Sequence, residues 1–186
     1  DYSKDFLVMQ INFTLESFGS FFLVFFAAGA VMANFTFESE IGPLMGGFSS
    51  GIILFLIIFA LGKYSRGHVN PGVSYMEYRM GYIKFNTFLV YSFFQILGSI
   101  AAGFSLKLII GNVADVGSNL PLLKSEHNIL ISFVTEFILS FLLASVIILV
   151  AYIQKLTLIL LALSVGLVVC VEVIVFGGLT GAAMNP

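Results

Sequence analysis

The stretch GIILFLIIFALGKYSRGHVNPGVS, residues 51–74, contains two kinds of signal. Its first half is apolar on every face, and only a few residues separate that run from Asn70-Pro71. An Asn-Pro pair ends one helix and can begin another, because proline lacks an N–H group and fits the first turn of a helix. The stretch therefore predicts a membrane-spanning helix followed by a short re-entrant helix that begins at Pro71.

The composition extends this reading to the whole chain. Of its 186 residues, 59% are apolar and 10% are charged, and the mean hydropathy is +1.07. A soluble domain has about 25% charged residues, so this chain is an integral, multi-pass membrane protein. Apolar runs without alternation exclude a β-barrel. The predicted fold class is an all-α membrane bundle with five spans of about 20 residues, placed near 11–33, 44–62, 86–110, 129–152 and 156–177.

The basic residues predict an orientation. Short cytoplasmic connections carry an excess of Lys and Arg. The side that holds the N-terminus and the first Asn-Pro loop has six basic residues, against two near the other side, so we expect the N-terminus and this loop to be cytoplasmic. The six are Lys4, Lys63, Arg66, Arg79, Lys84 and Lys155, and the two are Lys107 and Lys124.

An internal repeat divides the chain. The pattern E-x-x-x-S-F-x-L begins at Glu16 in the first span and again at Glu136 in the fourth, and an Asn-Pro pair follows each glutamate some 50 residues later. Three spans separate the copies, an odd number, so the copies are inverted in the membrane. Inverted repeats with a broken helix in each half are typical of a midplane transport site. We expect one channel domain over 1–186, with repeat one at about 1–110 and repeat two at about 129–186.

Asn185 and Pro186 stand at the end of the chain, inside the second motif. We therefore expect the second half-helix and a sixth span, which the repeat implies, to lie beyond these residues.

Both motifs resemble those of the aquaporin, or major intrinsic protein, family. Residues 62–74 resemble its first signature loop, and residues 177–186 resemble the start of its second. Glu16, Glu136 and Gln95 also match buried positions of the family. The resemblance implies six spans and two half-helices per subunit, a homotetramer in the lipid bilayer with one pore in each subunit, and passage of water.

The Asn-Pro residues explain such conduction. A half-helix that starts at Pro71 or Pro186 points its positive end at the midplane, where the amides of Asn70 and Asn185 donate hydrogen bonds to water. The same positive potential opposes cations. Gly72 stands where the family usually has alanine, so we expect looser packing and a lower helix propensity there. Arg66 replaces a usual glycine.

The family narrows its pore with a selectivity filter. Counting from the two loops places Ser50, Val173 and Ala182 at three of its four positions. These small or aliphatic side chains predict a gap that admits glycerol, urea or ammonia as well as water. The short 111–128 connection favours a strict water channel instead. The sequence therefore does not decide between water alone and wider neutral solutes.

Buried ionisable groups need partners inside a membrane. The resemblance implies that Glu16 and Glu136 brace the two loops by accepting N–H bonds, and that His68 packs beneath the first loop. His68 could also gate the pore with pH, since imidazole titrates near neutrality. For Glu172, beside the filter, we favour a structural hydrogen bond.

Other function classes lack their signals. The sequence has no catalytic set, metal-ligand cluster or cofactor motif, so we expect no enzyme, metal or cofactor. A net charge of −2 argues against nucleic-acid binding. The single cysteine, Cys170, lies away from the filter and predicts weak inhibition by mercury. Two alternatives remain, an ion- or proton-coupled carrier that uses Glu172 or Glu16 and a non-conducting structural membrane protein.

Overall fold

The computed structural model describes residues 2–37, 42–120 and 126–186, and every regular element in these ranges is a helix. Within these ranges five helices are long and apolar enough to cross a membrane, which confirms the predicted fold class. A short helix begins at Pro71, as expected. In chain order the elements are α1 (Tyr2–Thr36), α2 (Pro43–Leu61), α3 (Pro71–Arg79), α4 (Phe85–Ile109), α5 (Ala114–Gly117), α6 (Glu126–Ile147), the π-helix η1 (Ile148–Ile153) and α7 (Leu158–Thr180).

Three spans differ from the expectation at their ends, and one of them is α7, which covers Leu158–Thr180 rather than 156–177. The first helix continues to Thr36 rather than 33 and begins at Tyr2 rather than 11, because a helix can extend past its apolar part. The fourth span changes from α-helix to π-helix at Ile148. A hydropathy pattern shows which part of a helix is apolar. It cannot show how far a helix continues beyond that part, or where an α-helix changes to a π-helix.

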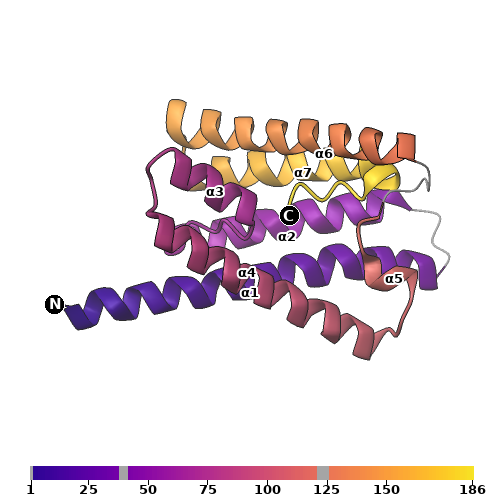
Figure 1. Cartoon of the computed structure of the whole chain (residues 1–186), viewed down its shortest axis with the longest axis horizontal. Coiled ribbons are helices and arrows are strands. Elements are labelled where there is room, and N and C mark those ends of the chain that lie inside the picture. The colour runs from indigo at the N-terminus through magenta and orange to yellow at the C-terminus, as the bar shows by residue number, and fades with distance from the viewer. Residues whose placement is uncertain (1, 38–41, 121–125) are drawn as a thin grey trace.

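The two Asn-Pro loops enter the bundle from opposite ends (Figure 1). The segment after α2 and helix α3 approach from the end where α1 begins, and the segment after α7 returns from the other end to the centre of the molecule. The connections that carry most of the basic residues gather at the first of these ends. Lys124, on which the predicted charge asymmetry also depends, lies outside the described residues.

The two halves of the chain approach each other closely where α2 meets α7 at a pair of glycines. A Cβ added at Gly51 would lie 2.5 Å from the carbonyl oxygen of Gly166, and one added at Gly166 would lie 2.6 Å from the carbonyl oxygen of Gly51. Small residues allow membrane helices to approach in this way. The reciprocal contact is what a two-fold axis between inverted halves produces.

Helix α5 is a left-handed turn rather than an ordinary helix. Ala114, Asp115 and Val116 have φ angles of 47°, 48° and 58°, and the turn packs against α1. There Gly117 approaches so closely that an added Cβ would lie 2.6 Å from the carbonyl oxygen of Ala28. The connection between α4 and α6 is therefore held against the bundle where it begins.

Candidate functional site

The two Asn-Pro loops have the same backbone conformation. Each has positive φ angles at the residues four, three and one positions before its asparagine, although non-glycine residues seldom adopt such angles. The angles are 73°, 63° and 42° at Arg66, Gly67 and Val69, and 91°, 47° and 49° at Gly181, Ala182 and Met184. The inverted repeat therefore extends to single backbone angles.

The asparagine side chains connect the loops in a reciprocal pair of hydrogen bonds. Asn70 Nδ2 donates to the carbonyl oxygen of Met184 at 2.7 Å, and Asn185 Nδ2 donates to the carbonyl oxygen of Val69 at 3.1 Å. A side-chain amide has two N–H donors. Each asparagine therefore keeps one further donor beside the cavity that it lines.

Asn70 is also the N-cap of α3. Its Oδ1 accepts from the N–H groups of Gly72 at 2.7 Å and Val73 at 3.3 Å, with Pro71 at the first helical position. These bonds fix the amide with its nitrogen directed away from the helix. A methyl group on Gly72 would lie 3.1 Å from that Oδ1 and 3.6 Å from Pro186 Cδ. The expected loosening at Gly72 is therefore small, because other atoms already occupy the surroundings.

A buried glutamate holds the first loop from behind. Glu16 on α1 is completely buried and accepts hydrogen bonds from the backbone N–H groups of His68 at 3.0 Å and Val69 at 2.7 Å. Gln95 on α4 donates to the same carboxylate at 2.8 Å. Three donors around one carboxylate compensate its removal from water.

Glu136 on α6 has the same relation to the second loop. Its carboxylate accepts from the backbone N–H groups of Ala183 at 3.1 Å and Met184 at 3.0 Å, and from the hydroxyl of Thr180 at 2.6 Å. The residues it holds are the counterparts of those that Glu16 holds. Two helices of opposite direction thus fix two loops by one pattern of bonds.

His68 is buried under the first loop. Its Nδ1 lies 3.0 Å from Ser74 Oγ, and its ring packs edge-on against Tyr91 with the centroids 5.4 Å apart. Its Nε2 is buried and has no hydrogen-bond partner among the residues that the structure describes. A charged imidazole would need a partner at this nitrogen, so the geometry fits a neutral ring.

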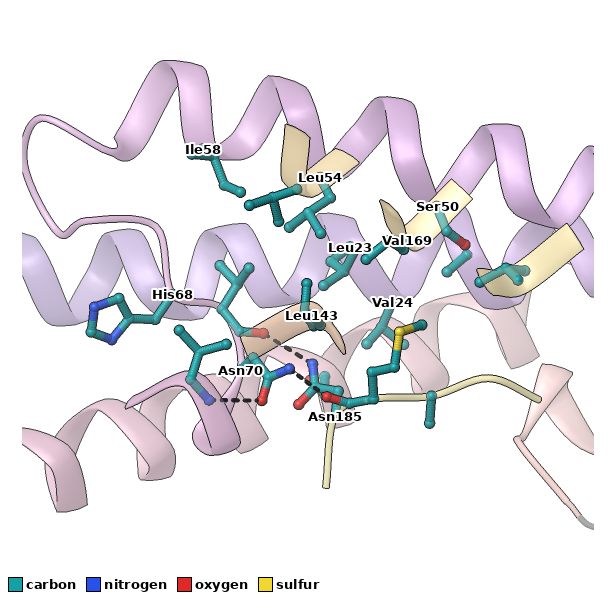
Figure 2. A pocket seen from close by; sticks show the side chains of 18 of the residues that line it. Leu23, Val24, Ser50, Leu54, Ile58, His68, Asn70, Leu143, Val169 and Asn185 are labelled. Atoms are coloured by element: carbon teal, nitrogen blue, oxygen red, sulfur yellow. Dashed lines mark hydrogen bonds between the residues drawn. The ribbon is translucent and has the colours of Figure 1, made fainter. Parts of the chain in front are cut away.

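A cavity of about 750 Å³ runs beside both loops (Figure 2). Ser50, Val173 and Ala182, the predicted filter residues, line this one cavity together with Asn70 and Asn185. Figure 2 shows both asparagines at its centre and Ser50 some distance along α2. The structure thus places the predicted filter and the Asn-Pro residues along one path.

The remaining wall is mainly apolar and follows single helix faces. On α2 and α7 the lining residues recur every three or four positions, as one face of a helix does. They are Gly46, Ser50, Leu54, Ile58 and Gly62 on the side of α2, and Leu158, Leu161, Val165, Val169 and Val173 on α7. The sixteen steps from Gly46 to Gly62 correspond to about 24 Å of helix, so the cavity is long.

Glu172 differs from the prediction. It is buried, but neither carboxylate oxygen has a hydrogen-bond partner within the described ranges, so the expected structural hydrogen bond is not present there. It does not line the cavity. No group of three His, Cys, Asp or Glu residues in the described part of the chain could hold a metal ion.

Sequence reasoning missed the residues at one end of the cavity. Arg66, Glu77, Tyr82 and Tyr152 all line it there. Arg66 stood out as a basic residue of the loop and as a departure from a motif, and Glu77 and the tyrosines carried no signal. Their relation depends on tertiary contacts between segments up to 86 positions apart, as between Arg66 and Tyr152.

Comparison with known proteins identifies the architecture. The model of the major intrinsic protein family matches residues 7–186. The chain is 30% identical over 171 residues to aquaporin NIP3-1 of Oryza sativa subsp. japonica, covering 92% of this chain and 54% of the relative. It is 29% identical over 172 residues to nodulin-26 of Glycine max, covering 92% and 62%. It thus spans little more than half the length of these curated relatives.

A solved structure is similar over nearly the whole chain. The X-ray structure of the aquaglyceroporin from Plasmodium falciparum aligns with a TM-score of 0.77 at 26% identity. The alignment covers 96% of this chain and 77% of that one.

Proposed function

Because the chain belongs to the major intrinsic protein family, we propose that it forms a passive transmembrane channel for water and small neutral solutes. One observation carries the proposal. Two amide donors, from loops that enter from opposite ends, meet in the middle of a long cavity whose walls are mainly apolar.

Such a cavity suits water in transit. The apolar walls offer no strong binding site, so a water molecule is not held along most of the path. At the centre, the free N–H groups of Asn70 and Asn185 receive its oxygen, because their other donors are already bonded to the opposite loop. One weak binding point in a long channel permits selective but rapid flow.

The same centre disfavours cations. The first turn of α3 begins at Pro71 beside the cavity, and the N-terminus of a helix carries a partial positive charge. Amide donors add positive edges at the same point. A hydronium or sodium ion would meet these groups without a compensating carboxylate, since Glu16 and Glu136 are bonded to the backs of the loops.

Ser50, Val173 and Ala182 form the proposed selectivity filter. Their side chains are small or aliphatic and line the same cavity as the two asparagines. A filter of this kind leaves room for a solute wider than water. We therefore extend the proposal to glycerol, urea and ammonia, and the similarity to an aquaglyceroporin supports glycerol in particular.

Glu16, which is buried, Glu136, which is partly buried, and His68 are proposed to hold the loops in place. Each carboxylate accepts two consecutive backbone N–H groups that no helix or sheet satisfies. Without these acceptors the loops would have unpaired N–H groups in a membrane interior, which is costly.

The assembly follows as part of the same proposal. We propose a single channel domain over 1–186, with repeats at about 1–110 and 129–186, in a lipid bilayer with the N-terminus and first Asn-Pro loop cytoplasmic. Many large apolar side chains are exposed on the spans, among them Phe18, Phe59, Phe93 and Phe137. Lipid or neighbouring subunits of a homotetramer would cover them.

Stopped-flow light scattering of proteoliposomes that contain the full chain tests this function. We expect rapid shrinkage under an osmotic step and rapid reswelling with glycerol, neither altered by a pH gradient. Flux no faster than through empty liposomes would contradict a channel. Flux that requires the gradient would favour a proton-coupled carrier. Glu172, whose carboxylate has no hydrogen-bond partner among the described residues, is the candidate site for it.

A further inference from the structure

Four side chains meet at the end of the cavity remote from Ser50. Arg66 Nη1 lies 2.8 Å from Glu77 Oε2, and the Tyr152 hydroxyl donates to the other oxygen of the same carboxylate. The guanidinium lies 5.8 Å from the centre of the Tyr82 ring, which stacks on Tyr152 at 4.1 Å. We refer to these four residues as the Arg66 cluster.

The cluster joins segments from both halves of the chain across the cavity. Arg66 belongs to the first Asn-Pro loop, Glu77 to α3, and Tyr152 to η1 at the end of the fourth span. Tyr82 lies in the turn after α3. All four line the cavity, so the contacts between them lie in its wall.

The backbone at two of these residues departs from the usual geometry. Arg66 has a φ of 73°, a left-handed conformation that non-glycine residues seldom adopt. Tyr152 lies in a π-helix, a rare form that occurs often at functional sites. The two residues with this unusual backbone, Arg66 and Tyr152, are the ones whose side chains contact the carboxylate of Glu77.

The two charged side chains of the cluster, Arg66 and Glu77, differ in their exposure to solvent. The Glu77 side chain is 4% exposed, whereas that of Arg66 is 47% exposed. A buried carboxylate needs its partners, and here they hold the guanidinium at the end of the cavity. The half-exposed guanidinium presents a positive charge and further N–H donors to whatever enters.

Resting on the proposed channel function, we propose that the Arg66 cluster is a second selectivity point, which limits passage of neutral solutes wider than water. It acts at the opposite end of the pore from Ser50, Val173 and Ala182.

The test compares glycerol and water permeability of the full chain in proteoliposomes. The variant Arg66→Gln with Glu77→Gln removes both charges together, so that no buried charge is left alone. We expect the glycerol-to-water ratio to rise about two- to tenfold, the equivalent of one hydrogen bond. Tyr152→Phe, which leaves the ion pair intact, is expected to raise the ratio less.

Arg79 and Tyr75 provide matched controls. They form a similar pair, with the guanidinium nitrogen 2.9 Å from the hydroxyl, but neither residue lines the cavity. Arg79→Gln and Tyr75→Phe should leave the ratio unchanged.

An unchanged ratio in the double variant, with normal folding, would overturn the proposal. If the double variant does not fold, Tyr152→Phe decides in the same way. Absence of water flux in the unaltered chain would instead overturn the channel function itself, so the two failures are distinguishable.

Discussion

At the residue scale, Ala182 tests the proposed filter. It lines the cavity, whereas Cys170, the single cysteine of the chain, is buried in α7 and does not. We predict that mercury ions inhibit water flow only weakly in the unaltered protein. Ala182→Cys should make the flow strongly sensitive to mercury and reversible by a thiol. Full block of the unaltered protein, or no gain in the variant, would contradict this placement of the filter.

His68 leads to a prediction on pH. The ring is buried, its Nδ1 faces Ser74, and neither ring nitrogen is bonded to a carboxylate of the described residues. A neutral imidazole with no stabilising partner for its charged form will not protonate in the physiological range. Water permeability should therefore stay constant between about pH 5 and pH 8. A pH response that disappears in His68→Asn would show that the histidine gates the pore.

At the scale of the elements, the sequence predicted what depends on local pattern. The five spans follow from apolar length, and the start of α3 follows from Asn70-Pro71. The π-helix at Ile148 and the left-handed turn at Ala114 could not be predicted. Nothing in their local composition distinguishes them, because tertiary contacts to α3 and to α1 stabilise these backbones.

The candidate site also has a part that the sequence predicted and a part that it could not predict. The repeat of Glu16 and Asn70 by Glu136 and Asn185 can be read directly from the spacing. The bonds between the loops, in contrast, depend on positive φ angles. The valine at position 69 gives no indication of such an angle in the sequence. Sequence spacing could therefore indicate which residues meet but not which atoms.

The loop contacts predict the stability of three carboxylate variants. Glu16→Gln or Glu136→Gln would turn an acceptor oxygen into an amide donor facing a backbone N–H, at a cost of about 1–3 kcal/mol. We expect both variants to unfold at a lower temperature in detergent, followed by circular dichroism. Glu172→Gln is the control, because its carboxylate has no described partner to lose. Equal destabilisation by all three would contradict loop bracing.

At the scale of the whole molecule, one two-fold relation unites these features. Gly51 and Gly166 contact each other reciprocally, Glu16 and Glu136 hold equivalent loop residues, and each asparagine binds the opposite loop. Such a molecule has a centre to which both halves contribute alike. The two asparagines should therefore matter to a similar extent, although one lies near the middle of the chain and the other at its end.

Water permeability of Asn70→Asp, Asn185→Asp and the double variant tests this claim most directly, with Asn86→Asp, an exposed residue of α4, as the control. A carboxylate removes the donor and introduces negative charge at the centre, so we predict a loss of about tenfold in each single variant, the equivalent of one hydrogen bond. The double variant should fall little further, and the control should match the unaltered protein. Unaltered permeability in either well-folded single variant would contradict a shared central site.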